Sequence, residues 1–256
     1  MSFVICVANE KGGVAKTTSV LSLGGALSEA GKSVLLIDLD AQANLTVALE
    51  AGLTTRGIPA CRVLLDGASI SQATAKTSIP GLDLLTSGEE MSLVERLLPA
   101  RPDYETRLRR LLRGEPLDYD YIIIDCPPLL GAVTTNALAA SDLLIMPTQA
   151  EYFSIHALKN VLNLIRLVRS ASNPSLRYRI LLTMFDKRNR IHRILQEQLR
   201  ETFSEGVFQT VIEVDTRLRE SPISGLPITM HAPASRSAVQ YRTLAQEIEA
   251  YAQETV

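Results

Sequence analysis

Short runs of Val, Ile and Leu alternate with helical stretches along the whole 256-residue chain. The runs are continuously apolar rather than alternating, which is typical of parallel strands that are buried on both faces. They predict strands at Phe3–Ala8, Ser33–Asp38, Leu82–Thr86, Tyr121–Asp125, Leu143–Pro147, Arg179–Met184 and Val207–Val214. The pattern therefore favours an α/β protein with a mostly parallel central sheet flanked by helices.

Between these runs, apolar residues recur at helical spacing. They predict helices at about Thr17–Ala30, Leu93–Leu98, Tyr104–Arg113, Ala132–Ala140, Ile155–Ser170, Arg190–Phe203 and Ser237–Ala252. The stretch Ala51–Pro80 is the least regular part, and we expect it to hold short helices over the sheet. No linker, internal repeat or low-complexity segment divides the chain, so we expect one doubly wound domain over residues 1–256.

The composition fits a globular protein, with 46% hydrophobic and 21% charged residues and a formal net charge of −2. A near-neutral chain is not built to bind nucleic acid over its whole surface, so any polyanion would have to meet a local basic patch. The three cysteines are far apart and form no C-x-x-C pair, which argues against a disulfide framework or a zinc site. The first apolar run is too short to span a bilayer and lacks the marks of a signal peptide, which predicts a cytoplasmic protein without membrane attachment.

The loop between the first strand and the first helix, residues 9–18, reads NEKGGVAKTT. A strand, a glycine turn and a helix N-terminus together present backbone N–H groups and a positive dipole end to a phosphate chain. Lys16 would reach the β- and γ-phosphates, and the Thr17 hydroxyl would be a magnesium ligand. The general pattern G-x-x-x-x-G-K-[ST] is not met, because its glycine positions hold Glu10 and Ala15. Taken alone, such a loop could also be a solvated turn.

What the loop does match is K-G-G-x-x-K-[ST]-[ST], with Lys11 five residues before Lys16. This resembles the deviant Walker A motif of the ParA/MinD superfamily of ATPases. The resemblance implies that Lys11 crosses to the nucleotide of a partner subunit, so that two subunits close around two ATP molecules. It also implies that ATP is bound by Lys11, Gly12, Gly13, Val14, Ala15, Lys16, Thr17 and Thr18. Family members usually have glycine where this chain has Ala15.

Carboxylates follow two of the predicted strands: Asp38 and Asp40 at the end of the second, and Asp125 at the end of the fourth. The carboxyl ends of parallel strands meet at one edge of the sheet, beside the phosphate loop, where magnesium and the attacking water must lie. By resemblance, Asp125 is the Walker B carboxylate that holds magnesium, Asp38 helps position the metal, and Asp40 orients or activates water. We thus expect Lys11, Lys16 and Asp40 to be catalytic, and Thr17, Asp38 and Asp125 to serve the metal. Without the loop, Asp38 and Asp40 would be interpreted as turn caps.

The resemblance continues through residues 181–190 and 215–222, and so covers nearly the whole chain. Family members line the adenine pocket near the end of the sixth predicted strand. This implies that Met184, Asp186 and Pro222 lie near the base. Plain core packing is an equal interpretation of Met184.

Several branches of the superfamily share this ATPase domain. MinD relatives end in a basic amphipathic helix, whereas the segment Ser237–Val256 has more Glu than Arg and is expected to pack on the domain. Iron–sulfur carriers need paired cysteines at a dimer axis. Cys126 is the only candidate here, and one thiolate per subunit is too few for a four-cysteine cluster. The chain begins on its first strand, so we expect no N-terminal helix-turn-helix domain. The short ParA/Soj type remains, and its members bind DNA without sequence preference.

Charge is unevenly distributed along the chain. Residues 1–100 hold seven basic and ten acidic residues, whereas residues 160–220 hold eleven basic and seven acidic residues. The short-type relatives place DNA-contacting basic residues in this second region, which here implies Arg188, Arg190, Arg193, Arg217 and Arg219. The alternative is a solvated helix face with ordinary ion pairs, such as Arg193 with Glu197.

The resemblance therefore implies a cytoplasmic, nucleoid-associated switch that uses ATP and Mg²⁺, forms a homodimer and binds non-specific DNA. A ParB-like or cargo-adaptor protein is expected to stimulate its slow hydrolysis. The cargo could be a chromosome, a plasmid or a protein complex. One alternative is a MinD-like or polar regulator that recruits a protein complex without binding DNA. Another is a metabolic enzyme that transfers phosphate to a small acid.

Overall fold

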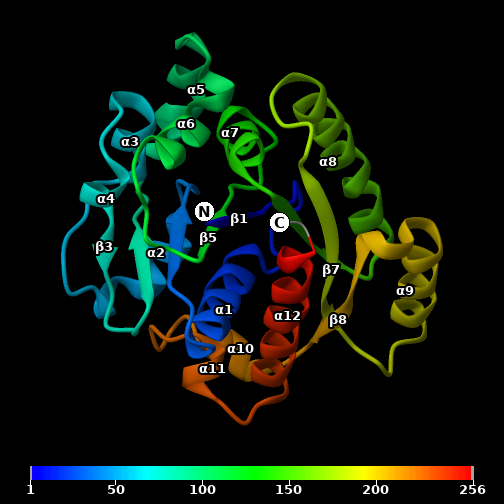
Figure 1. The fold of residues 1–256 in the computed structure, drawn as a ribbon. Coiled ribbons are helices and arrows are strands. Elements are labelled where there is room, and N and C mark those ends of the chain that lie inside the picture. Colours follow the sequence, from blue (N-terminus) through cyan, green and yellow to red (C-terminus); the bar gives the residue numbers. More distant parts are fainter. Residues whose placement is uncertain (1, 255–256) are drawn as a thin grey trace.

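The apolar runs of the sequence form one continuous sheet. The computed structural model describes residues 2–254, except for the side chains of residues 152–157. The strand order is β3-β4-β2-β5-β1-β6-β7-β8, and every pair is parallel except β3 with β4 (Figure 1). The strands are β1 Phe3–Val7, β2 Val34–Asp38, β3 Ala75–Lys76, β4 Leu82–Leu85, β5 Tyr121–Asp125, β6 Leu143–Gln149, β7 Arg177–Phe185 and β8 Val207–Glu213. The predicted α/β class and all seven predicted strands are confirmed.

Two features of the sheet differ from the sequence prediction. The edge strand β3 was not predicted, because a two-residue antiparallel strand leaves no periodic pattern. Strand β7 begins at Arg177 rather than Arg179, since its charged first residues do not form an apolar run. The guanidinium groups of Arg177 and Arg179 lie 5.6 and 4.9 Å from the centre of the Tyr251 ring, so the start of the strand is covered by cation–π contacts.

The helices agree with the periodic stretches at their centres and differ at their ends. They are α1 Lys16–Glu29, α2 Asn44–Leu49, α3 Ala60–Asp66, α4 Ile70–Ala73, α5 Met91–Leu97, α6 Arg107–Gly114, α7 Ala132–Ala140, α8 Tyr152–Ala171, α9 Arg190–Phe203, α10 Thr216–Glu220, α11 Ile228–His231 and α12 Arg236–Gln253. The stretch 51–80 holds the expected short helices α3 and α4. The helix predicted from Tyr104 starts instead with a 3₁₀ turn, Tyr104–Thr106, and becomes α-helical at Arg107. The short helices α2, α10 and α11 were not predicted.

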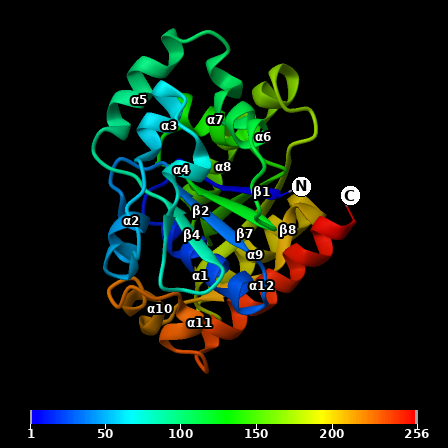
Figure 2. The same ribbon diagram turned by 60° about the vertical axis from the view of Figure 1, so that its left-hand side comes forward.

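Helices cover both faces of the sheet, as the continuous apolar strands require (Figures 1 and 2). Alternate residues of β1 enter two separate cores: Val4 and Cys6 face one, and Ile5 and Val7 face the other. The first core includes residues of α3, α5, α6, α7 and α8, and the second includes residues of α1, α2, α11 and α12. All three cysteines are buried and free, and Cys6 and Cys126 have their sulfur atoms 3.4 Å apart.

The C-terminal helix α12 packs against α1 and β8, as its apolar spacing predicted. Tyr241, Leu244 and Ile248 are fully buried, and the Tyr241 hydroxyl is 3.0 Å from that of Ser19 on α1. Among the described helices, none is long and apolar enough to cross a membrane.

Helix α1 begins after an unusual backbone conformation. Ala15, immediately before the helix, has φ 68° and ψ 36°, which is the left-handed region that disfavours residues with a Cβ. The same conformation occurs at Gly13, where it carries no steric cost. The chain therefore keeps a side chain at a position whose geometry suits glycine.

We expect Ala15→Gly to raise the free energy of unfolding by about 1 kcal/mol, because glycine adopts a left-handed conformation without the steric cost of a Cβ. Urea unfolding of the variant and the parent measures the difference. The control is Ala250→Gly, the same change at an exposed position of α12, which should lower stability by about 1 kcal/mol. A loss of stability in both variants would show that the prediction for Ala15 is wrong.

Candidate functional site

Three neighbouring strands end at the same edge of the sheet and bring the predicted acidic residues together. Strand β5 lies between β2 and β1, and its last residue, Asp125, is in register with Asp38 of β2 and Val7 of β1. The phosphate loop continues directly from β1 and leads into α1. The sequence thus folds so that the loop and the two strand-end carboxylates share one edge, as the parallel arrangement predicted.

The phosphate loop is held by hydrogen bonds to β6 and β7 and is open at its glycines. The buried Asn9 side chain donates to the Pro147 carbonyl at 2.7 Å and accepts from the Lys11 amide at 3.0 Å. The Thr183 hydroxyl on β7 donates to the Val14 carbonyl at 3.0 Å. By contrast, a Cβ added at Gly12 or Gly13 would meet no atom within 4 Å. The open side is therefore shaped to receive a ligand close to the backbone.

Lys16 is buried at the start of α1, and its ammonium lies 3.3 Å from the Lys11 carbonyl oxygen. Burial lowers the pKa of Lys16, and the negative charges of Asp125 and Asp40 oppose that shift. A bound polyphosphate would add negative charge beside the ammonium and favour its charged form.

Lys11 lies on the exposed side of the loop and contacts the end of β6 and the residues just after it. Its ammonium donates to the Gln149 side chain at 2.9 Å and pairs with the Glu151 carboxylate at 2.7 Å. Gln149 also donates to the Gly13 carbonyl at 3.3 Å, so it links β6 to the loop. Within one chain, Lys11 therefore points toward its own Glu151 and not toward Lys16.

Asp38 and Asp125 are buried carboxylates in very different surroundings. Asp38 accepts hydrogen bonds from the amides of Asp40 and Thr46 and from the Thr46 hydroxyl, which partly offset the burial that raises its pKa to about 6. Both oxygens of Asp125 are buried and lack a well-formed hydrogen bond within the described residues. Burial, with the charge of Asp38, raises the pKa of Asp125 well above its ordinary value, against the Thr17 hydroxyl and the Lys16 ammonium.

The oxygen atoms of Asp125 and Thr17 are suitable ligands for magnesium. A buried carboxylate without a well-formed hydrogen bond is costly unless a cation or donor meets it. Asp125 is such a group, and the Thr17 hydroxyl beside it supplies a further oxygen of the kind that Mg²⁺ prefers. Bound there with the nucleotide, the metal would neutralise phosphate charge. Thr17 and Asp125 would hold it, with Asp38 close by, and Lys16 would contact the phosphates.

Asp40 lies nearer the surface than Asp38 and lines the pocket beside the phosphate loop. It is 9% exposed, its carboxylate accepts from the Gln42 amide at 3.0 Å, and it lines a pocket of about 560 Å³. The pocket is bounded by Gly12, Gly13, Ala15, Lys16, Thr17, Thr18, Asp40, Gln42, Asn44, Val47, Ala48, Pro128, Pro222 and Ile223. Six of the eight predicted phosphate-loop residues, Asp40 and Pro222 are thus brought to one pocket, which Lys11 and Val14 do not line.

A second, smaller pocket of about 50 Å³ shares Ala15 and Thr18 with the first. Met184 lines it, together with residues at the end of β8 and with Leu218 and Arg219 of α10. Asp186 lines neither pocket: its carboxylate makes two hydrogen bonds of 3.1 Å to the Arg188 guanidinium on the outside of the sheet. The structure therefore places Met184 and Pro222 in pockets that share residues of the phosphate loop, and it pairs Asp186 with Arg188.

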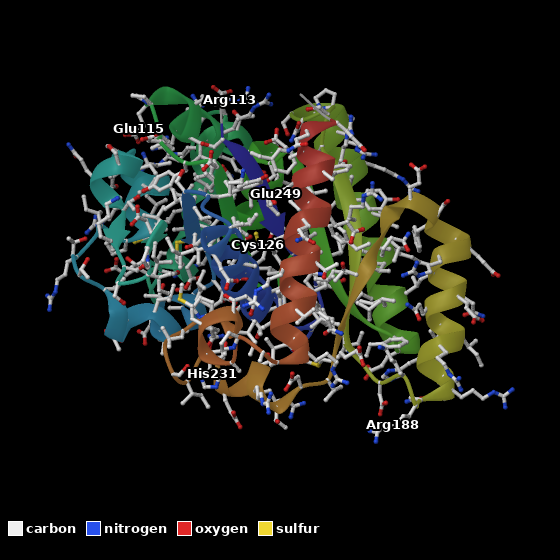
Figure 3. The ribbon with its side chains drawn as sticks, turned by 60° about the horizontal axis from the view of Figure 1, so that its bottom comes forward. Arg113, Glu115, Cys126, Arg188, His231 and Glu249 are labelled. Carbon is white, nitrogen blue, oxygen red and sulfur yellow. The ribbon has the colours of Figure 1, made fainter. Side chains whose placement is uncertain are left out.

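The five arginines predicted to contact DNA are all exposed. Arg188 follows β7, Arg190 and Arg193 lie on α9, and Arg217 and Arg219 lie on α10. Figure 3 shows Arg188 at the periphery, far from the interior position of Cys126. In the part of the chain that the structure describes, no ion pair joins Arg193 to Glu197.

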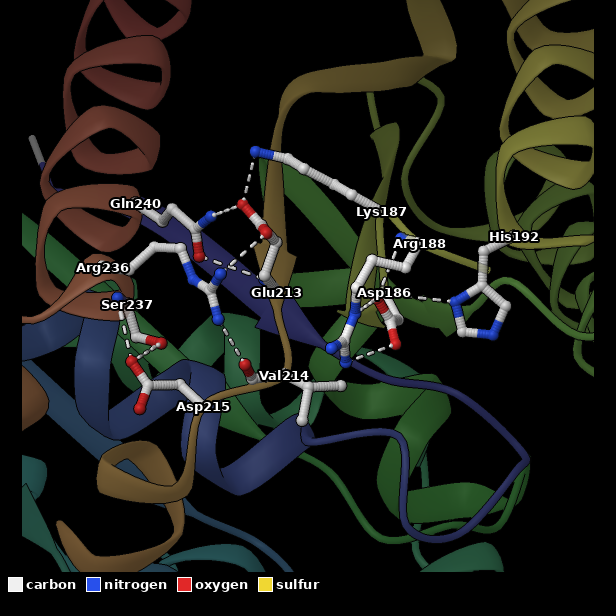
Figure 4. A network of polar contacts seen from close by, with 10 residues as sticks. All are labelled: Asp186, Lys187, Arg188, His192, Glu213, Val214, Asp215, Arg236, Ser237 and Gln240. Atoms are coloured by element: carbon white, nitrogen blue, oxygen red, sulfur yellow. Dashed lines mark hydrogen bonds and ion pairs between the residues drawn. The ribbon is translucent and has the colours of Figure 1, made fainter. Parts of the chain in front are cut away.

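A polar network joins the ends of β7 and β8, from which these arginine segments start (Figure 4). The Val214 amide donates to the Phe185 carbonyl at 3.1 Å. The buried Glu213 carboxylate pairs with Lys187 at 2.8 Å and with Arg236 of α12 at 3.1 Å. The two arginine-bearing segments are therefore tied to each other and to the C-terminal helix.

Sequence reasoning missed several residues that shape the site. Gln149 ends β6, the strand beside β1, and Glu151 follows it. Their place at a parallel strand end is the signal that could have found them. Thr46 and Ser87, which contact the aspartate segment, carry no motif that distinguishes them from other hydroxyl residues.

Known proteins were compared with this fold and site. A family model described as an AAA domain matches residues 2–178. The sporulation initiation inhibitor protein Soj of Bacillus subtilis is 39% identical over 253 residues, covering 98% of this chain and 99% of that protein. The chromosome partitioning protein ParA of Caulobacter vibrioides is 36% identical over 248 residues, covering 96% and 93%.

Among solved structures, a Mycobacterium smegmatis protein named cobyrinic acid a,c-diamide synthase, with bound ADP and magnesium, is 32% identical. Its TM-score is 0.85, and the match covers 100% of this chain and 97% of that one. Full-length similarity of this degree, on a fold whose phosphate loop, Asp38, Asp40 and Asp125 share one edge of the sheet, means that the chain belongs to the Soj/ParA family of P-loop ATPases.

Proposed function

We propose that this ATPase is a dimerising switch that binds DNA without sequence preference in its ATP-bound form and segregates or positions a cargo. The observation that carries the proposal is the different placement of the two lysines of the phosphate loop. Lys16 is buried at the phosphate pocket, whereas Lys11 lies on its outer side. The name of the Caulobacter relative, a chromosome partitioning protein, supports a role in partition.

The lysine arrangement suggests how nucleotide would control assembly. Within one chain the Lys11 ammonium pairs with Glu151, and Lys11 does not line the pocket that contains Asp40. Transferring it to a phosphate chain on a facing subunit would exchange one exposed ion pair for charge-assisted hydrogen bonds to a polyanion. That exchange favours the dimer only when ATP is bound, which makes assembly depend on the γ-phosphate.

DNA binding would follow from assembly. A single chain has a net charge of −2 and exposes a small set of arginines on α9 and α10. A dimer presents two such sets on one DNA, so that binding of the second is intramolecular and total affinity rises steeply. The proposed location of the ATP-bound protein is therefore the nucleoid.

Hydrolysis would release the dimer. Asp40 is the carboxylate that lines the pocket beside Lys16, and we assign to it the orientation of the attacking water. Catalysis that relies on positioning and charge neutralisation is slow when the group that orients the water acts only weakly. A ParB-like or cargo-adaptor protein is the partner that we expect to stimulate it.

The lysine assignment predicts different defects for two substitutions. Lys16→Ala should abolish binding of a fluorescent ATP analogue. Lys11→Ala should preserve binding and weaken ATP-dependent dimerisation by about 10- to 100-fold, since charge-assisted hydrogen bonds across the interface are lost. Nucleotide titration and sedimentation with a non-hydrolysable ATP analogue measure the two effects.

Lys32→Ala serves as the control, because Lys32 pairs with Glu249 away from the pocket and should leave both measurements unchanged. Dimerisation of Lys11→Ala at the parental protein concentration would contradict the cross-subunit role of Lys11.

The proposed DNA surface predicts salt-sensitive retention on random-sequence DNA in the presence of ATP. Arg190→Ala and Arg217→Ala should each weaken binding for every DNA sequence tested and reduce the slope of log affinity against log salt by about 1 per phosphate contact and subunit. Arg56→Ala removes an exposed arginine in the segment before α3 and should have no effect. Unchanged retention of the two variants, or no retention of the parent, would remove DNA binding from the proposal.

A further inference from the structure

The segment that carries Asp38 and Asp40 is held by hydrogen bonds that do not come from the phosphate loop. Asp38 is fully buried, and its Oδ1 accepts from the Asp40 amide at 3.1 Å. Its Oδ2 accepts twice from Thr46 of α2, from the amide at 2.9 Å and from the hydroxyl at 2.8 Å. The Thr46 hydroxyl therefore fixes one oxygen of Asp38 and, through it, the rotation of the carboxylate.

Ser87 reaches the same segment from the neighbouring strand. In the sheet, Ile37 is in register with Leu85, so the residues that follow β2 and β4 continue side by side. The Ser87 amide donates to the Thr46 hydroxyl oxygen at 2.9 Å. The Ser87 hydroxyl donates to the Asp40 main-chain oxygen at 2.7 Å. Ser87 is only 9% exposed, so water competes little for these contacts.

These bonds form one connected chain. The Thr46 oxygen accepts from Ser87 and donates to Asp38, which uses both capacities that a hydroxyl offers. Ser87 in turn fixes the backbone at Asp40. Neither Thr46 nor Ser87 lines the pocket that holds Lys16 and Asp40. Both therefore act on the pocket only through the two aspartates.

We propose that Thr46 and Ser87 are positioning residues for ATP hydrolysis, Thr46 by fixing the Asp38 carboxylate and Ser87 by fixing the backbone that carries Asp40. The proposal rests on the roles assigned above to Asp38 and Asp40. Groups that orient metal-associated carboxylates typically contribute about 10- to 100-fold to metal affinity or activity. The phosphate loop is braced separately, by Asn9 and Thr183, so nucleotide binding itself should be spared.

At saturating Mg²⁺, loss of either hydroxyl should lower kcat and leave the KM for ATP nearly unchanged. Thr46→Val keeps the shape of the side chain, removes the donor to Asp38 and leaves the buried Ser87 amide without its acceptor. Ser87→Ala removes the donor to the Asp40 carbonyl. We expect each to reduce kcat by about tenfold. Binding of a fluorescent ATP analogue without Mg²⁺ should stay within about twofold of the parent.

A second readout does not depend on turnover. Because Thr46 holds Asp38, Thr46→Val should raise the Mg²⁺ concentration needed for half-maximal tightening of nucleotide binding by about tenfold. Thr46→Ser keeps the hydroxyl and should restore both kcat and the Mg²⁺ response. If Thr46→Val does not fold in urea titrations, Ser87→Ala decides the proposal alone.

The matched control is Ser141→Ala. Ser141 is also buried, and its hydroxyl also donates to a main-chain carbonyl at 2.7 Å, that of Ala137 on α7. It should leave kcat unchanged. A kcat within twofold of the parent for Ser87→Ala, or an equal loss in Thr46→Ser and Thr46→Val, would overturn the proposal.

Asp40→Ala separates this proposal from the role of Asp40 itself. Parental turnover in Asp40→Ala would overturn the role of Asp40 and, with it, the positioning role of Ser87. A loss in Asp40→Ala together with normal turnover in Ser87→Ala would overturn the positioning role alone. A loss in both, with Ser141→Ala unaffected, supports it.

Discussion

The site depends on the burial of charge at one edge of a parallel sheet. Asp38 and Asp125 end adjacent strands and are almost inaccessible to solvent, and Lys16 is buried beside them. Burial opposes the charged form of all three, raising the pKa of both carboxyls and lowering that of the lysine. Such an arrangement costs stability unless a cation and a polyanion complete it. Mg²⁺ with a nucleotide is a ligand pair that supplies both charges.

The two carboxylates differ in their hydrogen bonds. Asp38 has its oxygens engaged by Asp40 and Thr46, whereas Asp125 has no well-formed hydrogen bond among the described residues. A fully engaged carboxylate is fixed in place, and a buried one without such bonds is available to a metal and its water shell. The segment after Asp125 is fixed in another way, because the Glu95 carboxylate accepts from the first two amides of α7 at 2.6 and 3.1 Å.

The sequence was sufficient for the seven apolar strands and for the meeting of Asp38 with Asp125, because both follow from apolar runs and parallel order. It was sufficient for the phosphate loop because the loop carries a motif. It was not sufficient for Thr46, Ser87 or Glu95, since their contacts depend on the register of β4 and the placement of α2 and α5. Gly131 illustrates the difference: a Cβ there would overlap the Glu95 carboxylate, yet the two residues lie 36 positions apart. The pairing of Asp186 with Arg188 likewise depends on a local turn that the apolar pattern does not reveal.

Some basic side chains near the proposed DNA surface have ion-pair partners within the chain, and others have none among the described residues. Three cations near the ends of β7 and β8 have internal partners: Lys187 and Arg236 pair with Glu213, and Arg188 pairs with Asp186. The Glu213 pairs are anchored on a buried carboxylate, and breaking them would leave that charge uncompensated. Positive charge available to a phosphate backbone therefore lies mainly on α9 and α10, whose exposed arginines have no ion pair among the described residues. So few cations in one chain would make only weak contact with DNA, and this is the physical reason why the proposed affinity depends on doubling the surface.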